Sequence, residues 1–161
     1  MRLLNFTIVA AAALIISAAR ADVTVTVDHN DTETAKPAFN FKRVPSPSKT
    51  DAASKAKFSL VDGDRDPAGG DLEKLNDAML PSEPDEPHEN FFFDAGTDGG
   101  RIGIDLGNAI EIQQINTYSW HPDTRGPQLY KLYAADGSEQ DFDASPKAGT
   151  DPTTDFVIVV R

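Results

Sequence analysis

A short polar and aromatic stretch, residues 118–127, carries the side chains best suited to chemistry; it comprises the loop from Trp120 to Pro127 and the two residues before it. Four of these side chains could stack on a sugar or hydrogen-bond to it: Tyr118, Trp120, His121 and Arg125. Aromatic faces pack against the apolar C–H faces of sugar rings, a guanidinium donates to hydroxyls, and an imidazole can donate or accept. The pattern predicts a carbohydrate-binding platform. The alternative is that Trp120 and Tyr118 are core residues and Arg125 makes a local salt bridge.

A second group of side chains could bind a cation. Asp62, Asp64, Asp66 and Glu73 are spaced like ligands of a calcium-binding EF-hand loop. The spacing fails where the sharp turn needs glycine, because Pro67 stands there. We therefore expect a solvated acidic turn, and a looser calcium site that uses one or two of these aspartates is the alternative.

The sequence lacks signatures of catalysis. It contains no His-Glu-x-x-His, Gly-x-Ser-x-Gly, phosphate-binding loop or dinucleotide fingerprint, and it has no cysteine. The glycine-rich stretch 96–103 has the spacing of a hairpin turn. A carboxylate pair like that of glycoside hydrolases is the remaining catalytic alternative, since acids abound in the chain. We predict a protein that is not an enzyme.

The elements that must position the loop have the patterns of β-strands. Residues 101–106 alternate Ile and Leu with Gly and Asp, which is the two-residue period of a half-buried strand. Further strands are predicted at 110–117 and 128–135, with a short one at 58–61. The fold class is therefore predicted to be all-β, with the loop 118–127 joining two strands.

The order of these motifs resembles the discoidin, or coagulation-factor C-type, domain of the galactose-binding-like superfamily. The similarity runs from Phe58 to Gly137 and rests on the succession Asp105-Leu106-Gly107, an apolar strand, Arg125-Gly126-Pro127, Tyr130-Lys131-Leu132-Tyr133 and Asp136-Gly137. It implies an eight-stranded jelly-roll β-sandwich that binds glycans, lipids or protein surfaces through loops at one end.

The resemblance also implies a structural calcium ion. Members of the superfamily often hold calcium with an Asp-Gly turn and ligands from distant strands. The matching dipeptide here is Asp77-Ala78, in which Ala78 replaces the glycine and so changes the backbone preference of the turn. Asp77 is the one metal ligand carried over.

The N-terminus predicts export. Arg2 precedes an apolar run from Leu3 to Ile16, and Ala19-Arg20-Ala21 has the small-x-small pattern of a signal-peptide cleavage site. We expect residues 1–21 to be removed, which gives a secreted, periplasmic or extracellular protein. An uncleaved anchor is the alternative, although the run is shorter than the roughly 20 apolar residues of a membrane span.

The mature chain is strongly acidic. Cleavage would remove two arginines and no acid, so the net charge would change from −11 to −13. Such a charge repels phosphate groups, which argues against nucleic acid and anionic membranes as partners. Solubility outside the cell is the simplest interpretation of the charge.

Two regions follow the predicted signal peptide. Residues 22–57 are predicted to form an opening strand and a polar linker, and residues 58–161 a discoidin-like domain with one or two helical turns at 71–79. The last apolar run is Phe156 to Val160. Because the resemblance implies further strands after this point, we expect a domain cut short, and a shortened sandwich closed by this run is the alternative.

These observations together predict an exported, non-catalytic β-sandwich that binds a glycan or cell-surface polysaccharide through the loop 118–127. The alternative is a structural or protein-interaction module, or a truncated remnant without a ligand. Calcium is the only cofactor expected.

Overall fold

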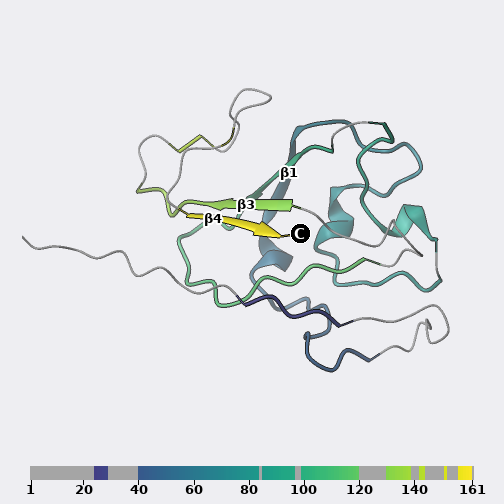
Figure 1. Cartoon of the computed structure of the whole chain (residues 1–161), viewed down its shortest axis with the longest axis horizontal. Helices are drawn as coiled ribbons and strands as arrows, with labels where there is room; N and C mark the ends of the chain where they lie inside the picture. The colour runs from purple at the N-terminus through teal and green to yellow at the C-terminus, as the bar shows by residue number, and fades with distance from the viewer. Residues whose placement is uncertain are drawn as a thin grey trace, which may run out of the picture.

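The computed structural model describes residues 24–28, 40–83, 85–96, 99–119, 130–138, 142–143 and 151, together with the backbone of 156–160. Four strands and three short 3-10 helices form this part of the chain (Figure 1). The predicted signal peptide lies outside the described residues. Within them, no helix has the length and apolar character needed to cross a bilayer.

The first sheet pairs β1 (Lys57–Asp62) with β2 (Arg101–Asp105) in antiparallel orientation. Phe58 lies opposite Ile104 and Leu60 opposite Ile102, with a register shift after Leu60. These two strands confirm the predictions for residues 58–61 and 101–106. The alternation of apolar and small or polar residues is what a pairing strand requires.

Glycines allow the chain to turn tightly at the end of this sheet. Gly63 follows β1 with φ of 85°, a conformation that costs glycine little. A Cβ on Gly100 would clash with the ring of Phe93 and the carbonyl of Asp62. Only glycine therefore fits where the chain enters β2.

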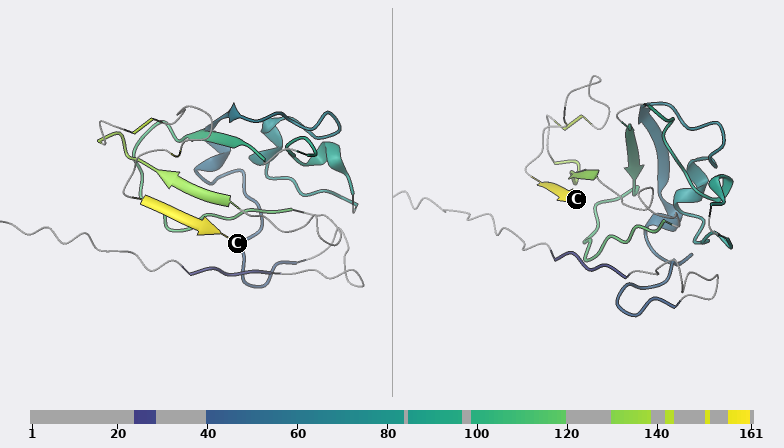
Figure 2. Two further views of the ribbon diagram at one scale, coloured as in Figure 1. Left: turned by 45° about the horizontal axis from the view of Figure 1, so that its top comes forward. Right: turned by 45° about the vertical axis from the view of Figure 1, so that its right-hand side comes forward.

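The second sheet pairs β3 (Tyr130–Ala134) with β4 (Phe156–Val160), also antiparallel. Tyr130 lies opposite Val160 and Ala134 opposite Phe156. The strand predicted at 128–135 is thereby confirmed. Figure 2 shows the β3–β4 sheet beside the β1–β2 sheet in both views, and the two sheets share no strand.

One acidic residue connects the two sheets electrostatically. Asp151 accepts a hydrogen bond from the Lys131 ammonium at 3.2 Å, on β3. Hydrogen bonds from Tyr133 and then Lys131 lower the pKa of Asp151, and the charge of Arg101 on β2 lowers it further. Asp151 is thus held to β3 and lies in the field of a charge on the other sheet.

Two predicted strands are wrong for the residues described. Residues 110–117 and 24–27 pair with no described strand. The apolar residues of both segments are exposed, including Ile112 (49%) and Val25 (63%). An alternating pattern forms a strand only when a partner supplies the ladder of hydrogen bonds.

One short 3-10 helix precedes β1, and two more lie between β1 and β2. They are η1 (Ala53–Lys55), η2 (Leu72–Leu75) and η3 (Pro87–Glu89), and η2 lies against β1. The helical turn predicted within 71–79 is confirmed in η2. Backbone hydrogen bonds join the two halves of the region, from Asp66 to Phe92 at 2.9 Å and from Asp94 to Asp64 at 2.8 Å.

The described residues form no closed core. None of their apolar side chains is fully buried, and only Gly69 and Pro81 are buried residues. The eight-stranded jelly-roll sandwich stays a prediction, because the described residues contain two separate two-stranded sheets.

Candidate functional site

The structure describes one of the four predicted sugar-binding residues. Tyr118 is half-buried at the point where the predicted loop begins. Trp120, His121 and Arg125 lie outside the described residues. The site can therefore be built from Tyr118 and from the residues that hold it.

Tyr118 is held by a segment far from it in sequence. Its hydroxyl donates a hydrogen bond to the carbonyl oxygen of Pro45 at 2.5 Å. Its ring meets that of Phe41 edge-on, with centroids 5.5 Å apart and an angle of 67° between the planes. Edge-to-face pairs of this kind are favourable beyond the area they bury. Both contacts fix the side chain, so Tyr118 anchors the start of the loop.

The protonation of Tyr118 suits this role. Partial burial raises the pKa of the phenol above its usual value of 10.0, and the negative charge of Asp51 raises it further. Both effects disfavour the phenolate. A phenol is already protonated at neutral pH, and the raised pKa extends to higher pH the range in which Tyr118 can donate to the Pro45 carbonyl.

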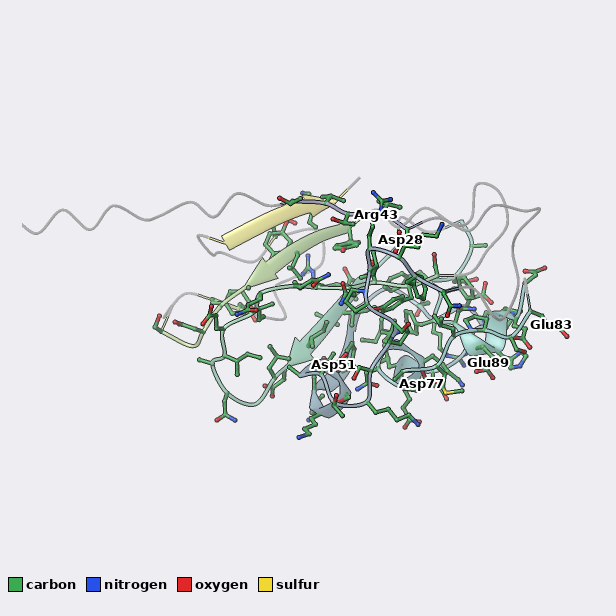
Figure 3. The ribbon with its side chains drawn as sticks, turned by 90° about the horizontal axis from the view of Figure 1, so that it is seen from below. Asp28, Arg43, Asp51, Asp77, Glu83 and Glu89 are labelled. Atoms are coloured by element: carbon green, nitrogen blue, oxygen red, sulfur yellow. The ribbon has the colours of Figure 1, made fainter. Side chains whose placement is uncertain are left out.

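The segment that receives Tyr118 is itself organised by Asp28. This carboxylate accepts three consecutive backbone N–H groups, from Lys42 at 2.8 Å, Arg43 at 2.6 Å and Val44 at 2.8 Å. The Arg43 side chain adds an ion pair to Asp28 at 3.2 Å and donates to the Val27 carbonyl. Figure 3 shows Asp28 and Arg43 close together, away from Asp77 and Glu89.

Asp28 is a strongly stabilised anion. Its side chain is only 7% exposed. Hydrogen bonds from the Arg43 and Val44 backbones, followed by those of the Arg43 side chain and Lys42, lower its pKa from 3.8 to about 2. Sequence reasoning missed this residue, because backbone donors 14 to 16 residues away leave no signal in side-chain types.

The predicted metal ligand Asp77 already has two partners. One carboxylate oxygen accepts the backbone N–H of Met79 at 2.8 Å, and the other lies 3.5 Å from the Lys74 ammonium. Lys74 also bonds to Glu89 at 2.7 Å, which is the main reason its pKa is raised. A calcium ion at Asp77 would have to displace this ammonium.

The described residues do not by themselves complete a calcium site. Calcium takes six to eight oxygen ligands. No three acidic or histidine side chains of the described residues gather in a group that could hold a metal. Calcium binding therefore stays a prediction. Ala78 does adopt the left-handed backbone conformation typical of the glycine that the resemblance implies, since its φ is 59°.

The EF-hand-like acids do not converge either. Asp62 accepts its neighbour's N–H, from Gly63 at 3.0 Å, and Asp66 accepts that of Ala68 at 2.7 Å. Asp64 is exposed. Each of the two bonded carboxylates thus stabilises its own local turn, as expected of an acidic turn.

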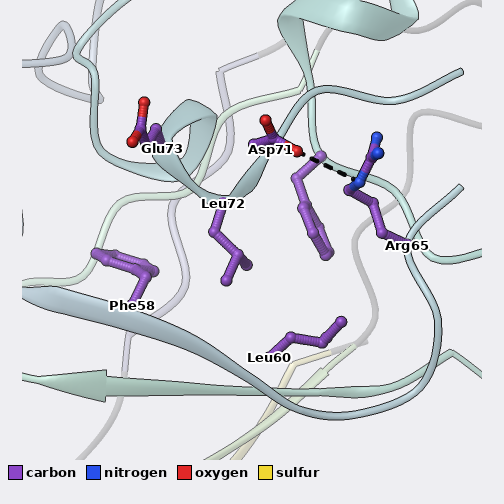
Figure 4. Close-up of a pocket in the computed structure, with 7 residues that line it drawn as sticks. Phe58, Leu60, Arg65, Asp71, Leu72 and Glu73 are labelled. Carbon is purple, nitrogen blue, oxygen red and sulfur yellow. Dashed lines mark ion pairs between the residues drawn. The ribbon is translucent and has the colours of Figure 1, made fainter. Parts of the chain in front are cut away.

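An open cleft of about 500 Å³ lies between β1 and η2 (Figure 4). Its apolar lining comes from Phe58, Leu60, Leu72 and Phe91, and charged side chains stand around it: Arg65, Asp71 and Glu73. Arg65 and Asp71 pair at 3.4 Å. Of these residues, the sequence pointed only to Glu73, as a ligand of the EF-hand-like loop, and it predicted no cleft here. The cleft could bind an apolar group, and the carboxylates of Asp71 and Glu73 could accept hydrogen bonds from it.

No known family, curated protein or solved structure matches this chain. The likeness to discoidin-type domains therefore rests on the residues quoted for it.

Proposed function

We propose that this chain is an exported, non-catalytic module of the discoidin type that binds carbohydrate through the loop 118–127. One observation carries the proposal: Tyr118, two residues before Trp120, is anchored by Pro45 and Phe41. A ligand-binding side chain that is held in place before the ligand arrives loses less conformational entropy on binding. Weak ligands such as sugars depend on such preorganisation.

Each remaining residue has a role in this proposal. Trp120 supplies the stacking face, Arg125 donates to hydroxyl pairs, and His121 donates or accepts a hydrogen bond. Pro122 and Pro127 fix φ inside the loop. Tyr118 contributes as the anchor, since its hydroxyl is already bonded to Pro45.

The overall charge supports the same class of partner. A net charge of −11, or −13 after removal of residues 1–21, disfavours polyanions. Uncharged polysaccharides carry no such penalty. The apolar N-terminal run supports a location where extracellular glycans are met.

Affinity gels of several polysaccharides test the proposal. The mature chain should be retarded on at least one gel, and Trp120→Ala should abolish the retardation while the melting temperature stays unchanged. His88→Ala is the matched control, because its side chain is 68% exposed and lies outside the loop. Equal retardation of wild type and Trp120→Ala, or unfolding of Trp120→Ala, would remove the loop from the proposal.

One observation favours a protein-interaction module as a second candidate. Ile104, Ile110, Ile112 and Ile115 are each between 46% and 51% exposed. Exposed apolar patches often mark protein contacts, and three of these isoleucines lie within one short stretch of the chain. Substitution of Ile112 by Lys should then abolish self-association in gel filtration or capture of a partner, whereas glycan retention should be unaffected.

A further inference from the structure

A chain of contacts links the N-terminal segment to the predicted binding loop. It begins at Asp28, whose carboxylate gathers the backbone N–H groups of residues 42, 43 and 44. Phe41 directly precedes these donors and Pro45 directly follows them. Those two residues are the ones that contact Tyr118. The two residues that contact Tyr118 therefore flank the turn that Asp28 holds.

The chemistry of Asp28 suits the turn that it holds. Three successive N–H groups that point to one place form an anion-binding concavity. An ionised carboxylate matches it, because charged acceptors make shorter and stronger bonds to backbone donors. Arg43 closes the arrangement by bonding to both Asp28 and the Val27 carbonyl. Loss of the carboxylate would leave three donors to be satisfied by water and would free the turn.

We infer that Asp28 is a positioning residue for Tyr118, one of the side chains assigned to sugar binding. The coupling from Asp28 to Tyr118 stands on the contacts alone, whereas its effect on sugar binding rests on the proposed function. If the proposed function holds, residues 24–28 therefore contribute to sugar binding through Tyr118.

The pKa of Tyr118 can be used to measure this coupling. Tyr118 titrates above its usual pKa because of partial burial and the charge of Asp51. Asp28→Asn should loosen residues 41–45 and expose the phenol, which lowers its pKa towards 10.0. The titration is followed by the ultraviolet absorbance of the phenolate. Circular dichroism at each pH identifies the pH range in which the protein is folded, and only that range is used. The difference between each protein and its Tyr118→Phe version isolates this tyrosine from Tyr130 and Tyr133.

Two further variants make the titration specific. Glu83→Gln makes the same chemical change at an exposed acid remote from Asp28 (Figure 3) and should leave the Tyr118 titration unchanged. Arg43→Gln keeps the carboxylate and the backbone donors, so it should produce a smaller shift than Asp28→Asn. If Asp28→Asn does not fold, the Tyr118 titration in Arg43→Gln tests the inference instead.

Double substitution supplies an independent test. If Asp28 acts through Tyr118, the losses in melting temperature caused by Asp28→Asn and Tyr118→Phe should not add, because either change breaks the same chain of contacts. The losses of Glu83→Gln and Tyr118→Phe should add. An unchanged Tyr118 titration in both Asp28→Asn and Arg43→Gln, or full additivity of the first pair, overturns the inference.

Binding to a polysaccharide gel extends the test to function. Asp28→Asn should weaken retention about two- to tenfold, which is what ordering one side chain on binding costs. If the wild type is not retained on any gel, the proposed function fails, and the titration alone decides whether Asp28 positions Tyr118.

Discussion

The Tyr118 hydroxyl lies 2.5 Å from the carbonyl oxygen of Pro45, 73 residues earlier in the chain. This contact connects the segment predicted as a linker to the start of the predicted binding loop. It is a directed bond, since a phenol donates at one atom and the half-buried ring fixes its direction. Phe41 and Pro45 are therefore part of the surroundings of Tyr118.

Substitution of Tyr118 by Phe should remove this bond and keep the ring contact with Phe41. We expect a loss of about 1 kcal/mol in the free energy of unfolding, the usual contribution of one hydrogen bond. Urea denaturation measures it. Tyr130→Phe makes the same change on β3 and is the matched control, which should change stability little. Equal losses in both variants would contradict the anchoring role.

The contribution of Asp28 to stability should depend on pH. Its pKa is lowered from 3.8 to about 2, first by the hydrogen bond from the Arg43 backbone. A lowered pKa means that the stabilisation is present above 3.8 and is lost as the pH falls through about 2. The difference in unfolding free energy between wild type and Asp28→Asn should therefore be constant from pH 7 to about 4 and shrink towards pH 2. A difference independent of pH would show that the carboxylate charge plays no part.

Replacement of Ala78 by Gly should stabilise the fold. Ala78 has φ of 59°, which costs a residue with a Cβ about 1–2 kcal/mol. Glycine removes that cost but gains entropy in the unfolded chain, so the net gain should be about 0.5–1 kcal/mol. Ala95→Gly is the control, because Ala95 is exposed without a positive φ and should be destabilised by the same change. A loss of stability in Ala78→Gly would contradict the turn geometry.

Calcium, if it binds at Asp77, must compete with the Lys74 ammonium. Saturating calcium should raise the melting temperature, and the rise should be larger in Lys74→Gln, where no ammonium opposes the ion. Asp77→Asn should abolish the rise. Identical melting curves in calcium and in chelator, for wild type and Lys74→Gln alike, would exclude the ion from this turn.

The strand predictions were correct where the segment with alternating apolar residues has another strand to pair with. Residues 57–62, 101–105 and 130–134 pair as strands because each has a complementary neighbour. Residues 110–117 have an equally apolar pattern and pair with no described strand. Local patterning reports which face could be buried, whereas pairing depends on distant segments.

The candidate site was foreseeable only at Tyr118. Its place in an aromatic loop suggested a ligand contact, whereas its bond to Pro45 depends on a fold that brings the two together. Asp28 gave no signal, because an isolated acid after a Thr-Val run is indistinguishable from a surface residue. Its role comes from backbone donors, which every non-proline residue carries.

The most direct test of the binding proposal uses the intrinsic fluorescence of Trp120, because it is the only tryptophan in the chain. The mature protein is titrated with fragments of the polysaccharide that retains it best. The proposal predicts a saturable change in emission, weakened in Arg125→Ala and absent with a polysaccharide that is not retained. Emission that stays constant while the fragments compete the protein off the gel would show that sugar binds elsewhere and that the loop 118–127 is not the site.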